Sequence, residues 1–451
     1  MSRAFGIGLG WLKTARGSMP MYCMGAIASV TAYYLMSDQW IDSQRRSFIQ
    51  KRKAASEQDS AVAEDAVAKG RFSSLVIGGR FVNPFETWRD KTLWDFVRWL
   101  ATRKSGNGLP RDRQLLAKDL PLAEPHFALL NAFSDKRGIR EKKAHHADSG
   151  IIEEKQSESP MCYAEYPAVE SMSRDETMTA TWLGQSTCFV QMQGLNILTD
   201  PIFKRRTVYS WLGPERLRPV PCELEDLPMP DIVLVSHNHF DHLDIDVVRK
   251  LGDSATWFVP LGLASWFARQ GVYNVREMDW WQENEFALDE QRRFTVVSTP
   301  TQHWSGRNGF DSNCSLWSSF LVRSSSGSSV FHCGDTGYCP AFEEVGRRYG
   351  PVTLAILPIG SYEPRWYMCH QHTNPEDAVL IHKDLRARRS IGVHWGTFMM
   401  SDEHYMAPPR DLALASIKHG LAADEFIAPQ FGKTYLCDIQ QKEEQQQEQQ
   451  N

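Results

Sequence analysis

The sequence predicts an α/β protein in which buried strands lead into loops that carry metal-binding side chains. Residues 231–235 (Asp-Ile-Val-Leu-Val) form a short β-branched run, which is typical of a buried strand. Three histidines and an aspartate follow within residues 236–242, on the loop that leaves this strand. A length of 451 residues and a hydrophobic share of 42% suit one large α/β domain or two ordinary ones.

The loop at residues 236–242 has the residue types and the spacing of a transition-metal site. Alternation along an extended chain directs His237 and His239 to the same side. Asp241 and His242 follow as the backbone turns, so they can face a second point nearby. Imidazole and carboxylate groups are ligands that Zn²⁺, Fe and Mn²⁺ accept, and the loop therefore predicts a metal site.

The loop resembles part of the metallo-β-lactamase signature, and this resemblance implies three more ligands downstream, each after a strand. The chain supplies candidates in that order. They are His303, Asp335 and His394. A single histidine in such a position is more often a hydrogen-bonded structural residue. Seven imidazole and carboxylate groups that all follow strands form a much more specific signal. A serine nucleophile is not expected, because the chain has no Gly-x-Ser-x-Gly elbow.

The order His-x-His-x-Asp-His, followed by single His, Asp and His residues, resembles the signature of the metallo-β-lactamase superfamily. This resemblance implies an α/β fold of four layers, an αββα sandwich, with an N-terminal extension. It also implies two Zn²⁺ ions per chain. One ion would be held by His237, His239 and His303, the other by Asp241, His242 and His394, and Asp335 would bridge them.

Longer motifs resemble one branch of this superfamily, the N-acylphosphatidylethanolamine-hydrolysing phospholipase D family. The similarity covers roughly residues 79–437. Its motifs are residues 181–184, 198–201, 334–340, 358–366 and 393–398. Two departures are visible, Gln185 where many relatives have histidine and Phe240 where tyrosine is frequent. Neither is an expected ligand, so both put substrate contact in doubt rather than metal loading.

The resemblance implies hydrolysis of N-acylphosphatidylethanolamine to N-acylethanolamine and phosphatidic acid, with a hydroxide between the two metals as the nucleophile. Asp241 and Asp335 would then have catalytic roles as well as ligand roles. His372 matches a histidine that lines the family's site, and would orient the phosphate or protonate the leaving group. The alternative for His372 is a structural one, capping the helix that begins near Asn374. His370 is the weaker choice by position.

Substrate contacts are expected from side chains next to the predicted ligands and within the family motifs. They are Trp304, Tyr362, Arg365 and Gln371. Arg365 has two competing interpretations, contact with the diester or a carbonyl oxygen and a buried pair with Glu363. Aromatic side chains with a polar group suit a membrane headgroup boundary. We therefore expect a substrate that is presented in a membrane.

Composition limits the other functions that the chain could have. A net charge of −5 argues against a nucleic-acid-binding protein. Nine cysteines without a Cys-x-x-Cys pair argue against a disulfide framework, and Cys333 and Cys339 are expected to pack beside Asp335 rather than bind metal. A homodimer is a further implication of the family resemblance. Two alternatives stay open, a related metal-dependent lactone or phosphoester hydrolase and a non-catalytic membrane scaffold on the same fold.

The amino-terminal segment differs from the rest of the chain. Residues 1–37 contain basic residues and no acidic residue, and residues 19–36 carry no charge. An uncharged stretch of about 18 residues is near the lower limit for spanning a bilayer. A membrane anchor, a mitochondrial presequence and a helix lying on the membrane all remain open. The expected location is the mitochondrial inner membrane, or another intracellular membrane.

The chain is expected to divide into six parts. These are a presequence or membrane anchor (1–45), a charged linker (46–78), a family-specific extension packing on the core (79–133), a mobile polar insertion (134–175), the catalytic domain (176–437) and a disordered Gln/Glu tail (438–451). Within the extension, Leu93, Phe96, Val97 and Leu100 share one helical face. We expect this face to pack against the core, with direct membrane contact as the alternative.

Overall fold

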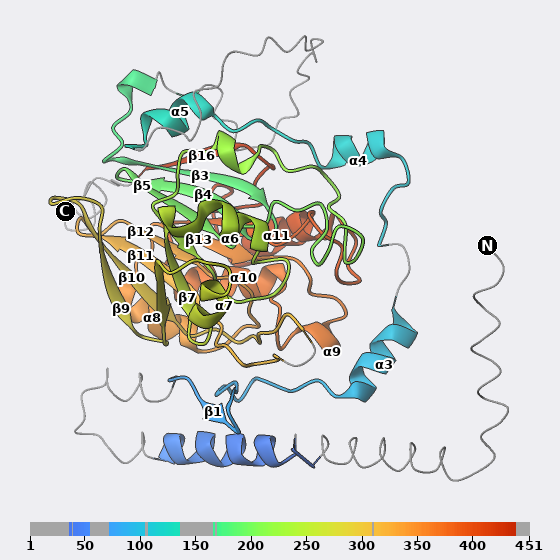
Figure 1. Ribbon diagram of the computed structural model, residues 1–451. Coiled ribbons are helices and arrows are strands. Elements are labelled where there is room, and N and C mark those ends of the chain that lie inside the picture. Colours follow the sequence, from blue (N-terminus) through green and yellow to red (C-terminus); the bar gives the residue numbers. More distant parts are fainter. Residues whose placement is uncertain are drawn as a thin grey trace, which may run out of the picture.

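Two seven-stranded sheets face each other and carry helices on their outer sides (Figure 1). The computed structural model describes residues 36–37, 39–54, 72–103, 107–135, 166, 169–308 and 311–438. Residues 1–35 and 38 of the expected presequence or anchor lie outside these residues. So do most of the polar insertion, including His145, and nearly all of the Gln/Glu tail.

The first sheet has the strand order β16-β3-β4-β5-β6-β7-β8. Strands β16, β3, β4 and β5 are antiparallel, and β5 to β8 are parallel. Their bounds are β3 Thr177–Gly184, β4 Thr187–Met192, β5 Leu195–Thr199, β6 Ile232–Leu234, β7 Thr256–Pro260, β8 Val275–Met278 and β16 Thr434–Asp438.

The second sheet has the order β15-β14-β13-β12-β11-β10-β9, again with an antiparallel half (β9 to β12) and a parallel half (β12 to β15). Because the parallel strands of each sheet run the same way, their carboxyl ends share one edge. The bounds are β9 Glu283–Ala287, β10 Arg293–Thr299, β11 Ser319–Ser324, β12 Ser329–His332, β13 Leu354–Pro358, β14 Arg389–Val393 and β15 Phe426–Ile427.

Strand β6 shows why the sheets are buried on both faces. Ile232 and Leu234 belong to the larger apolar cluster, which fills the space between the sheets. Val233 and Val235 alternate with them and join a second cluster with Val247 and other residues on the outer helices. A strand covered on both faces needs a continuous apolar run, which is the pattern that predicted it.

The outer layers consist of short helices. On the first sheet they include α6 Ile245–Leu251 and α7 Ala264–Ala268. On the second sheet they are α8 Ala341–Tyr349, α10 Pro375–Asp384 and α11 Ala407–Lys418. The remaining helices are α3 Leu93–Thr102, α4 Arg113–Asp119, α5 Phe127–Ala132 and α9 Arg365–Met368. The order of helix, sheet, sheet and helix is the αββα sandwich predicted from the sequence.

The segment before the sandwich is fastened to it by polar contacts. A helix at residues 39–54 crosses the expected boundary between residues 45 and 46. Its buried Arg45 donates to the carbonyl oxygens of Asn83, Phe85 and Trp88 at 2.9, 3.0 and 2.8 Å. The amide of Asn83 in turn donates to the carbonyl oxygen of His303 at 2.7 Å. The segment before the sandwich therefore reaches the backbone of a predicted metal ligand. It also contains the small hairpin of β1 Val76–Ile77 and β2 Arg80–Phe81.

The helix predicted near residues 93–100 forms as α3, but the prediction that its apolar face packs on the core is wrong. Leu93 and Leu100 are 74% and 51% exposed, and Phe96 and Val97 are also exposed. The protein-facing side of α3 instead carries Asp95, which is buried by its place in the N-terminal capping box. Periodicity defined the apolar face correctly but could not show what covers it. Within the described part of the chain, no helix combines the length and the apolar character needed to cross a membrane.

Candidate metal centre

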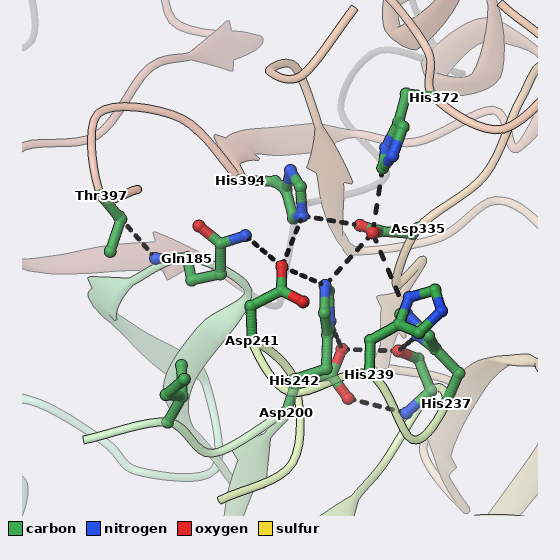
Figure 2. Close-up of polar contacts among 12 residues, drawn as sticks. Gln185, Asp200, His237, His239, Asp241, His242, Asp335, His372, His394 and Thr397 are labelled. Atoms are coloured by element: carbon green, nitrogen blue, oxygen red, sulfur yellow. Dashed lines mark hydrogen bonds and ion pairs between the residues drawn. The ribbon is translucent and has the colours of Figure 1, made fainter. Parts of the chain in front are cut away.

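The seven predicted ligands meet at the shared edge of the two sheets (Figure 2). The loop after β6 brings His237, His239, Asp241 and His242. The second sheet contributes the other three from the loops that follow β10, β12 and β14, namely His303, Asp335 and His394. The sequence order of the ligands therefore reflects four strand ends that converge in space.

The side chains form two groups of four that share one carboxylate. The ligand atoms within each group lie within 4.8 Å of one another. The first group is His237, His239, His303 and Asp335, and the second is Asp241, His242, Asp335 and His394. All of these side chains are buried except that of His239, which is partly exposed. The assignment of three residues to each side of Asp335 is the one that the sequence resemblance implied.

Asp335 lies between the two groups. Its Oδ2 atom is 3.2 Å from Nε2 of His242 and 3.7 Å from Nε2 of His303. Its Oδ1 atom is 3.1 Å from Nε2 of His394. One carboxylate therefore faces histidines of both groups, as a bridging ligand must.

Several ligand atoms have no hydrogen-bond partner although they are buried. They include Nε2 of His239, His242 and His394 and Oδ1 of Asp335. Buried polar atoms without partners are costly, and they need an explanation when they point at one another. Coordination of divalent cations by these atoms would satisfy them, so the residues present fit a metal centre.

The two groups differ in their proton affinity. Burial and the neighbouring imidazoles lower the pKa of His237 well below its usual range. Burial likewise lowers the pKa of His303 to about 3, although Asp335 acts in the opposite direction. Burial would also lower the pKa of His394, but Asp335 and Asp241 raise it to about 9. The imidazoles of the first group are therefore neutral and ready to bind a cation, whereas those of the second group must give up protons to do so.

Asp200, at the end of β5, supports ligands of both groups. Its Oδ2 atom accepts a hydrogen bond from Nδ1 of His242 at 2.8 Å and from the hydroxyl of Ser236 at 2.6 Å. The Ser236 hydroxyl oxygen also lies 2.9 Å from Nδ1 of His237. Nε2 of His332 is a further donor at 2.9 Å. Such outer partners fix the orientation of ligating imidazoles.

Gln185 contacts a ligand, contrary to the expectation that this departure from the family affects substrate contact. Its side-chain amide donates to Oδ2 of Asp241 at 2.7 Å. Its backbone carbonyl oxygen accepts from the backbone N–H of His394 at 2.9 Å. Its own backbone N–H donates to the hydroxyl of Thr397 at 2.7 Å. One residue therefore holds two members of the second group.

The variant Gln185→Leu is expected to weaken binding of a divalent cation at the second group by about 10- to 100-fold, because it removes the amide that orients Asp241. Gln185→His keeps one donor and should lose less. Competition with a chelating dye measures the affinity, and Gln291→Leu on the surface serves as the control. Equal affinities for all three variants would contradict the role given to Gln185.

His372 faces the metal centre rather than the helix start. Its Nδ1 atom is 3.8 Å from Oδ2 of Asp335, and its ring lies 5.2 Å from that of His303. The cap of α10 is supplied by Asn374, whose side chain accepts a hydrogen bond from the backbone of Asp377. His372 therefore does not cap α10, which was the structural alternative. His370 points away, toward the carbonyl oxygen of Thr87.

Arg365 adopts neither of its two expected roles. Its guanidinium donates to Asp377 at 2.6 Å and to the carbonyl oxygen of His372 at 3.0 Å. Glu363 accepts from the backbone N–H of Arg365 instead of pairing with its side chain. Arg365 therefore positions the segment that carries His372, because its charge is already matched by Asp377.

Two of the other expected substrate contacts lie beside the metal centre. The ring of Trp304 is 4.1 Å from that of His239 and is partly exposed. Gln371 contributes its carbonyl oxygen, which accepts from Nδ1 of His303 at 2.8 Å, while its side chain lies against Met368. Trp304 therefore lies against a predicted ligand and is partly exposed, whereas the backbone carbonyl group of Gln371 supports a predicted ligand.

Tyr362 is directed away from the metal centre. It is buried, and its hydroxyl donates to Asp411 at 2.6 Å on α11. Tyr362→Phe is therefore expected to lower the free energy of unfolding by about 1 kcal/mol, and to leave the KM for substrate unchanged. Thermal unfolding and steady-state kinetics measure the two effects. A several-fold rise in KM would instead support contact between Tyr362 and the substrate.

The supporting residues Asp200, Gln185 and His332 were not predicted. Asp200 stands at the end of a strand pattern and before a proline, within one of the family motifs. That position was a usable signal, because parallel strands end at one edge. Gln185 and His332 gave no comparable signal, since their partners lie far away in the sequence. Cys333 and Cys339 are buried free thiols that belong to neither ligand group.

Known proteins resemble this chain in both its domain and its length. Residues 195–395 match the β-lactamase superfamily domain. An N-acyl-phosphatidylethanolamine-hydrolyzing phospholipase D 1 from Caenorhabditis elegans is 41% identical over 380 residues, which are 81% of this chain and 94% of that protein. The chain belongs to the N-acyl-phosphatidylethanolamine-hydrolysing phospholipase D family.

Two further relatives are similar to this chain. A mitochondrial N-acyl-phosphatidylethanolamine-hydrolyzing phospholipase D from Saccharomyces cerevisiae is 36% identical over 376 residues, covering 82% of this chain and 78% of that protein. An uncharacterized protein from Mycobacterium tuberculosis is 39% identical over 251 residues, covering 54% of this chain and 65% of that protein. The family and the metallo-β-lactamase fold predicted from the sequence are confirmed.

Proposed function

We propose that this phospholipase D family member hydrolyses the phosphodiester of N-acylphosphatidylethanolamine, releasing N-acylethanolamine and phosphatidic acid. The chain is a metal-dependent phosphodiesterase, and its substrate is a phospholipid. The observation that carries the proposal is the pair of ligand groups that share Asp335. The chain that holds them is 41% identical to a relative named N-acyl-phosphatidylethanolamine-hydrolyzing phospholipase D 1. A decayed scaffold would be expected to lack ligands, so the complete set argues against that alternative.

The metal centre is proposed to hold two zinc ions. His237, His239 and His303 would hold one, Asp241, His242 and His394 the other, and Asp335 would contact both. Imidazole and carboxylate ligands without sulfur suit zinc. When bound, such a pair of cations supplies positive charge for the phosphoryl oxygens and lowers the pKa of water.

The protein's own residues then position the reacting groups. Hydrogen bonds from Gln185 and to Asp200 fix Asp241 and His242, so the phosphodiester meets a preorganised site. His372 lies beside Asp335, and its Nδ1 atom has no hydrogen-bond partner. Burial lowers the pKa of His372 well below its usual range. A neutral imidazole is a poor proton donor, which favours the orienting role of His372 over protonation of the leaving group.

The setting of the reaction is proposed from the substrate and from one relative's name. A phospholipid with long acyl chains resides in a membrane, so the enzyme is expected to act at a membrane surface. The relative from Saccharomyces cerevisiae is named as mitochondrial, which supports the mitochondrial location proposed for this chain. A homodimer is also proposed from the family. Sedimentation of the full chain at micromolar concentration tests that state.

Hydrolysis in ¹⁸O-labelled water tests the proposed reaction. Purified protein is incubated with N-acylphosphatidylethanolamine, and both lipid products are analysed by mass spectrometry. We expect one labelled oxygen in the phosphatidic acid, because water attacks phosphorus, and none with Asp335→Asn. Label in the N-acylethanolamine would mean attack at carbon. No cleavage of this lipid, alongside turnover of soluble lactones or phosphoesters, would favour the related hydrolase instead.

A further inference from the structure

The helix at residues 39–54 is held to the protein in an unusual way. It lies outside the two sheets, beside the hairpin of β1 and β2 (Figure 1). The structure describes every residue of this helix, and Arg45 is the only one of them that is buried. A surface helix normally buries apolar side chains and keeps its charges in water. Here a guanidinium group makes the fully buried contact, so the question is what it holds.

Arg45 binds the carbonyl oxygens of one short turn. Its Nε atom donates to Asn83 at 2.9 Å, and its Nη2 atom donates to Phe85 at 3.0 Å and to Trp88 at 2.8 Å. The backbone N–H of Trp88 also donates to the carbonyl oxygen of Phe85 at 3.2 Å. A guanidinium group has five N–H donors in one plane, so it can bind several carbonyl oxygens at once. We call residues 83–88 the clamp loop.

The charge of Arg45 is buried in order to make these contacts. Burial lowers the pKa of Arg45, although Asp90 and Asp42 act in the opposite direction. The contact with Asp42, within the same helix, is long, with 3.4 Å between Nη1 and Oδ1. Three shorter hydrogen bonds therefore connect the buried charge to the clamp loop, and loss of the guanidinium group would remove all three.

The clamp loop holds the backbone next to a predicted metal ligand. The side-chain amide of Asn83, which is 1% exposed, donates to the carbonyl oxygen of His303 at 2.7 Å. The hydroxyl of Thr87 donates to the side-chain oxygen of Gln302. His303 belongs to the first ligand group. Two side chains of the clamp loop thus bind two consecutive residues, one of which is a ligand.

The same loop holds the segment that leads to His372. Nδ1 of His370 donates to the carbonyl oxygen of Thr87 at 2.7 Å. The side-chain amide of Gln302 donates to the carbonyl oxygen of His370 at 2.9 Å. Thr87, Gln302 and His370 therefore form a closed set of hydrogen bonds between three separate parts of the chain. The clamp loop fixes the backbone beside His303 and the backbone that leads to His372.

We propose that Arg45 is a positioning residue for the first ligand group, and that docking of the helix at residues 39–54 is thereby coupled to cation binding there. The inference rests on the proposed metal centre and does not depend on the identity of the substrate. Gln185 orients two ligands of the second group instead. The effect of Arg45 should therefore fall on the first group.

The coupling must act in both directions. Outer partners of a ligand raise cation affinity because they hold the ligand in its binding orientation. If docking of the helix raises the affinity at the first group by some factor, a bound cation must favour the docked helix by the same factor. Cation binding at the metal centre should therefore be detectable at residues 39–54, which contain none of the predicted ligands.

Zinc affinity of the full chain tests the positioning role. Competition with a chelating dye measures both sites in wild type and in Arg45→Met. We expect the variant to lose about 10- to 100-fold at one site and less than about threefold at the other. Arg52→Met is the matched control and should change neither, because Arg52 lies in the same helix but donates to the carbonyl oxygen of Ser73 at 3.0 Å. In crystals of Arg45→Met at limiting zinc, anomalous scattering should show the lower occupancy beside His303.

Two further variants test the path through the clamp loop. Arg45→Lys keeps the charge but has a single donor nitrogen, so it should recover only part of the lost affinity. Asn83→Leu removes the contact with His303 and should weaken the same site. The double variant of Arg45→Met and Asn83→Leu should lose little more than either alone, because both act along one path. Fully additive losses would contradict this path.

Hydrogen exchange of residues 39–54 tests the coupling. In wild type, zinc should slow exchange of these backbone amides by about the factor that Arg45→Met loses in zinc affinity. Arg52→Met should keep this response to zinc, and Arg45→Met should lack it. A purely structural role for Arg45 predicts a different result, in which exchange of the helix changes equally with and without zinc.

The outcomes separate this inference from the proposed function. Equal zinc affinities for wild type and Arg45→Met would overturn the positioning role. Equal losses at both sites, together with a lower unfolding midpoint, would show general destabilisation and would overturn it as well. Wild-type protein that binds no zinc would overturn both this role and the proposed metal centre. Wild-type protein that binds two zinc ions but cleaves no phospholipid would contradict the proposed reaction alone, and selective loss in Arg45→Met would still support the positioning role.

Discussion

Asp335→Asn is expected to reduce phosphodiester hydrolysis by about three to four orders of magnitude and to lower the metal content of the purified protein. The carboxylate faces histidines of both ligand groups, with Oδ2 3.2 Å from Nε2 of His242 and Oδ1 3.1 Å from Nε2 of His394. An amide of the same shape keeps one oxygen but loses the negative charge. Two neighbouring cations then lack the anion that offsets their repulsion.

Metal content by mass spectrometry and turnover of the phospholipid measure this effect. Asp411→Asn is the matched control, because Asp411 accepts from Tyr362 and lies outside both ligand groups. The control should retain wild-type metal content and turnover within a few-fold. An Asp335→Asn protein with full metal content and activity would show that this carboxylate does not join the two groups.

Asp200→Asn is expected to have the second largest effect, although Asp200 is not itself a ligand. Burial would raise the pKa of Asp200, but His332 and His242 hold it at about 2, so the group is ionised and accepts from all its partners. The amide of asparagine would replace one acceptor oxygen by an NH₂ donor, which would face the donor groups that now bind Asp200. We expect a loss of about 3 kcal/mol in the free energy of unfolding, and metal affinity lowered by about 10- to 100-fold.

His332→Gln separates the two effects of Asp200. His332 donates to Asp200 at 2.9 Å but belongs to neither ligand group. Its replacement should destabilise the fold while changing metal affinity much less than Asp200→Asn. Chemical denaturation and chelator competition measure the two quantities. If both variants lowered metal affinity equally, orientation of His242 by Asp200 would not explain the loss.

The metal centre could be predicted from the sequence because its ligands follow strand ends. The run at residues 232–235 is apolar on both faces, and β6 is indeed covered on both. Its loop carries four ligands within six residues, so the local spacing already defines a site. The three later ligands were identified through the resemblance to the superfamily. They meet the loop because strands that run the same way deliver their carboxyl ends to a common edge.

The contacts around the ligands could not be predicted in the same way. Gln185 reaches Asp241 and His394, which lie far from it in the sequence, and no periodic pattern joins them. Arg365 had two plausible partners, and the structure pairs it with a third, Asp377. Side-chain direction decided each case, and direction depends on packing that a single sequence does not display.

Helix α3 shows a different limit. The periodic pattern at Leu93, Phe96, Val97 and Leu100 identified the apolar face, and the helix forms where expected. Trp99, on the other face, is the residue that stacks on the protein. An apolar helix face predicts burial against another apolar surface, and the core of the same protein is only the most frequent of these surfaces.

Anomalous scattering from crystals of the full chain, grown with zinc and recorded at its absorption edge, tests the two-group metal centre most directly. We expect two peaks about 3.5–4 Å apart on either side of the Asp335 carboxylate, one beside His237, His239 and His303 and the other beside Asp241, His242 and His394. A single peak, or two peaks that do not share Asp335, would contradict the arrangement on which the proposed hydrolysis depends.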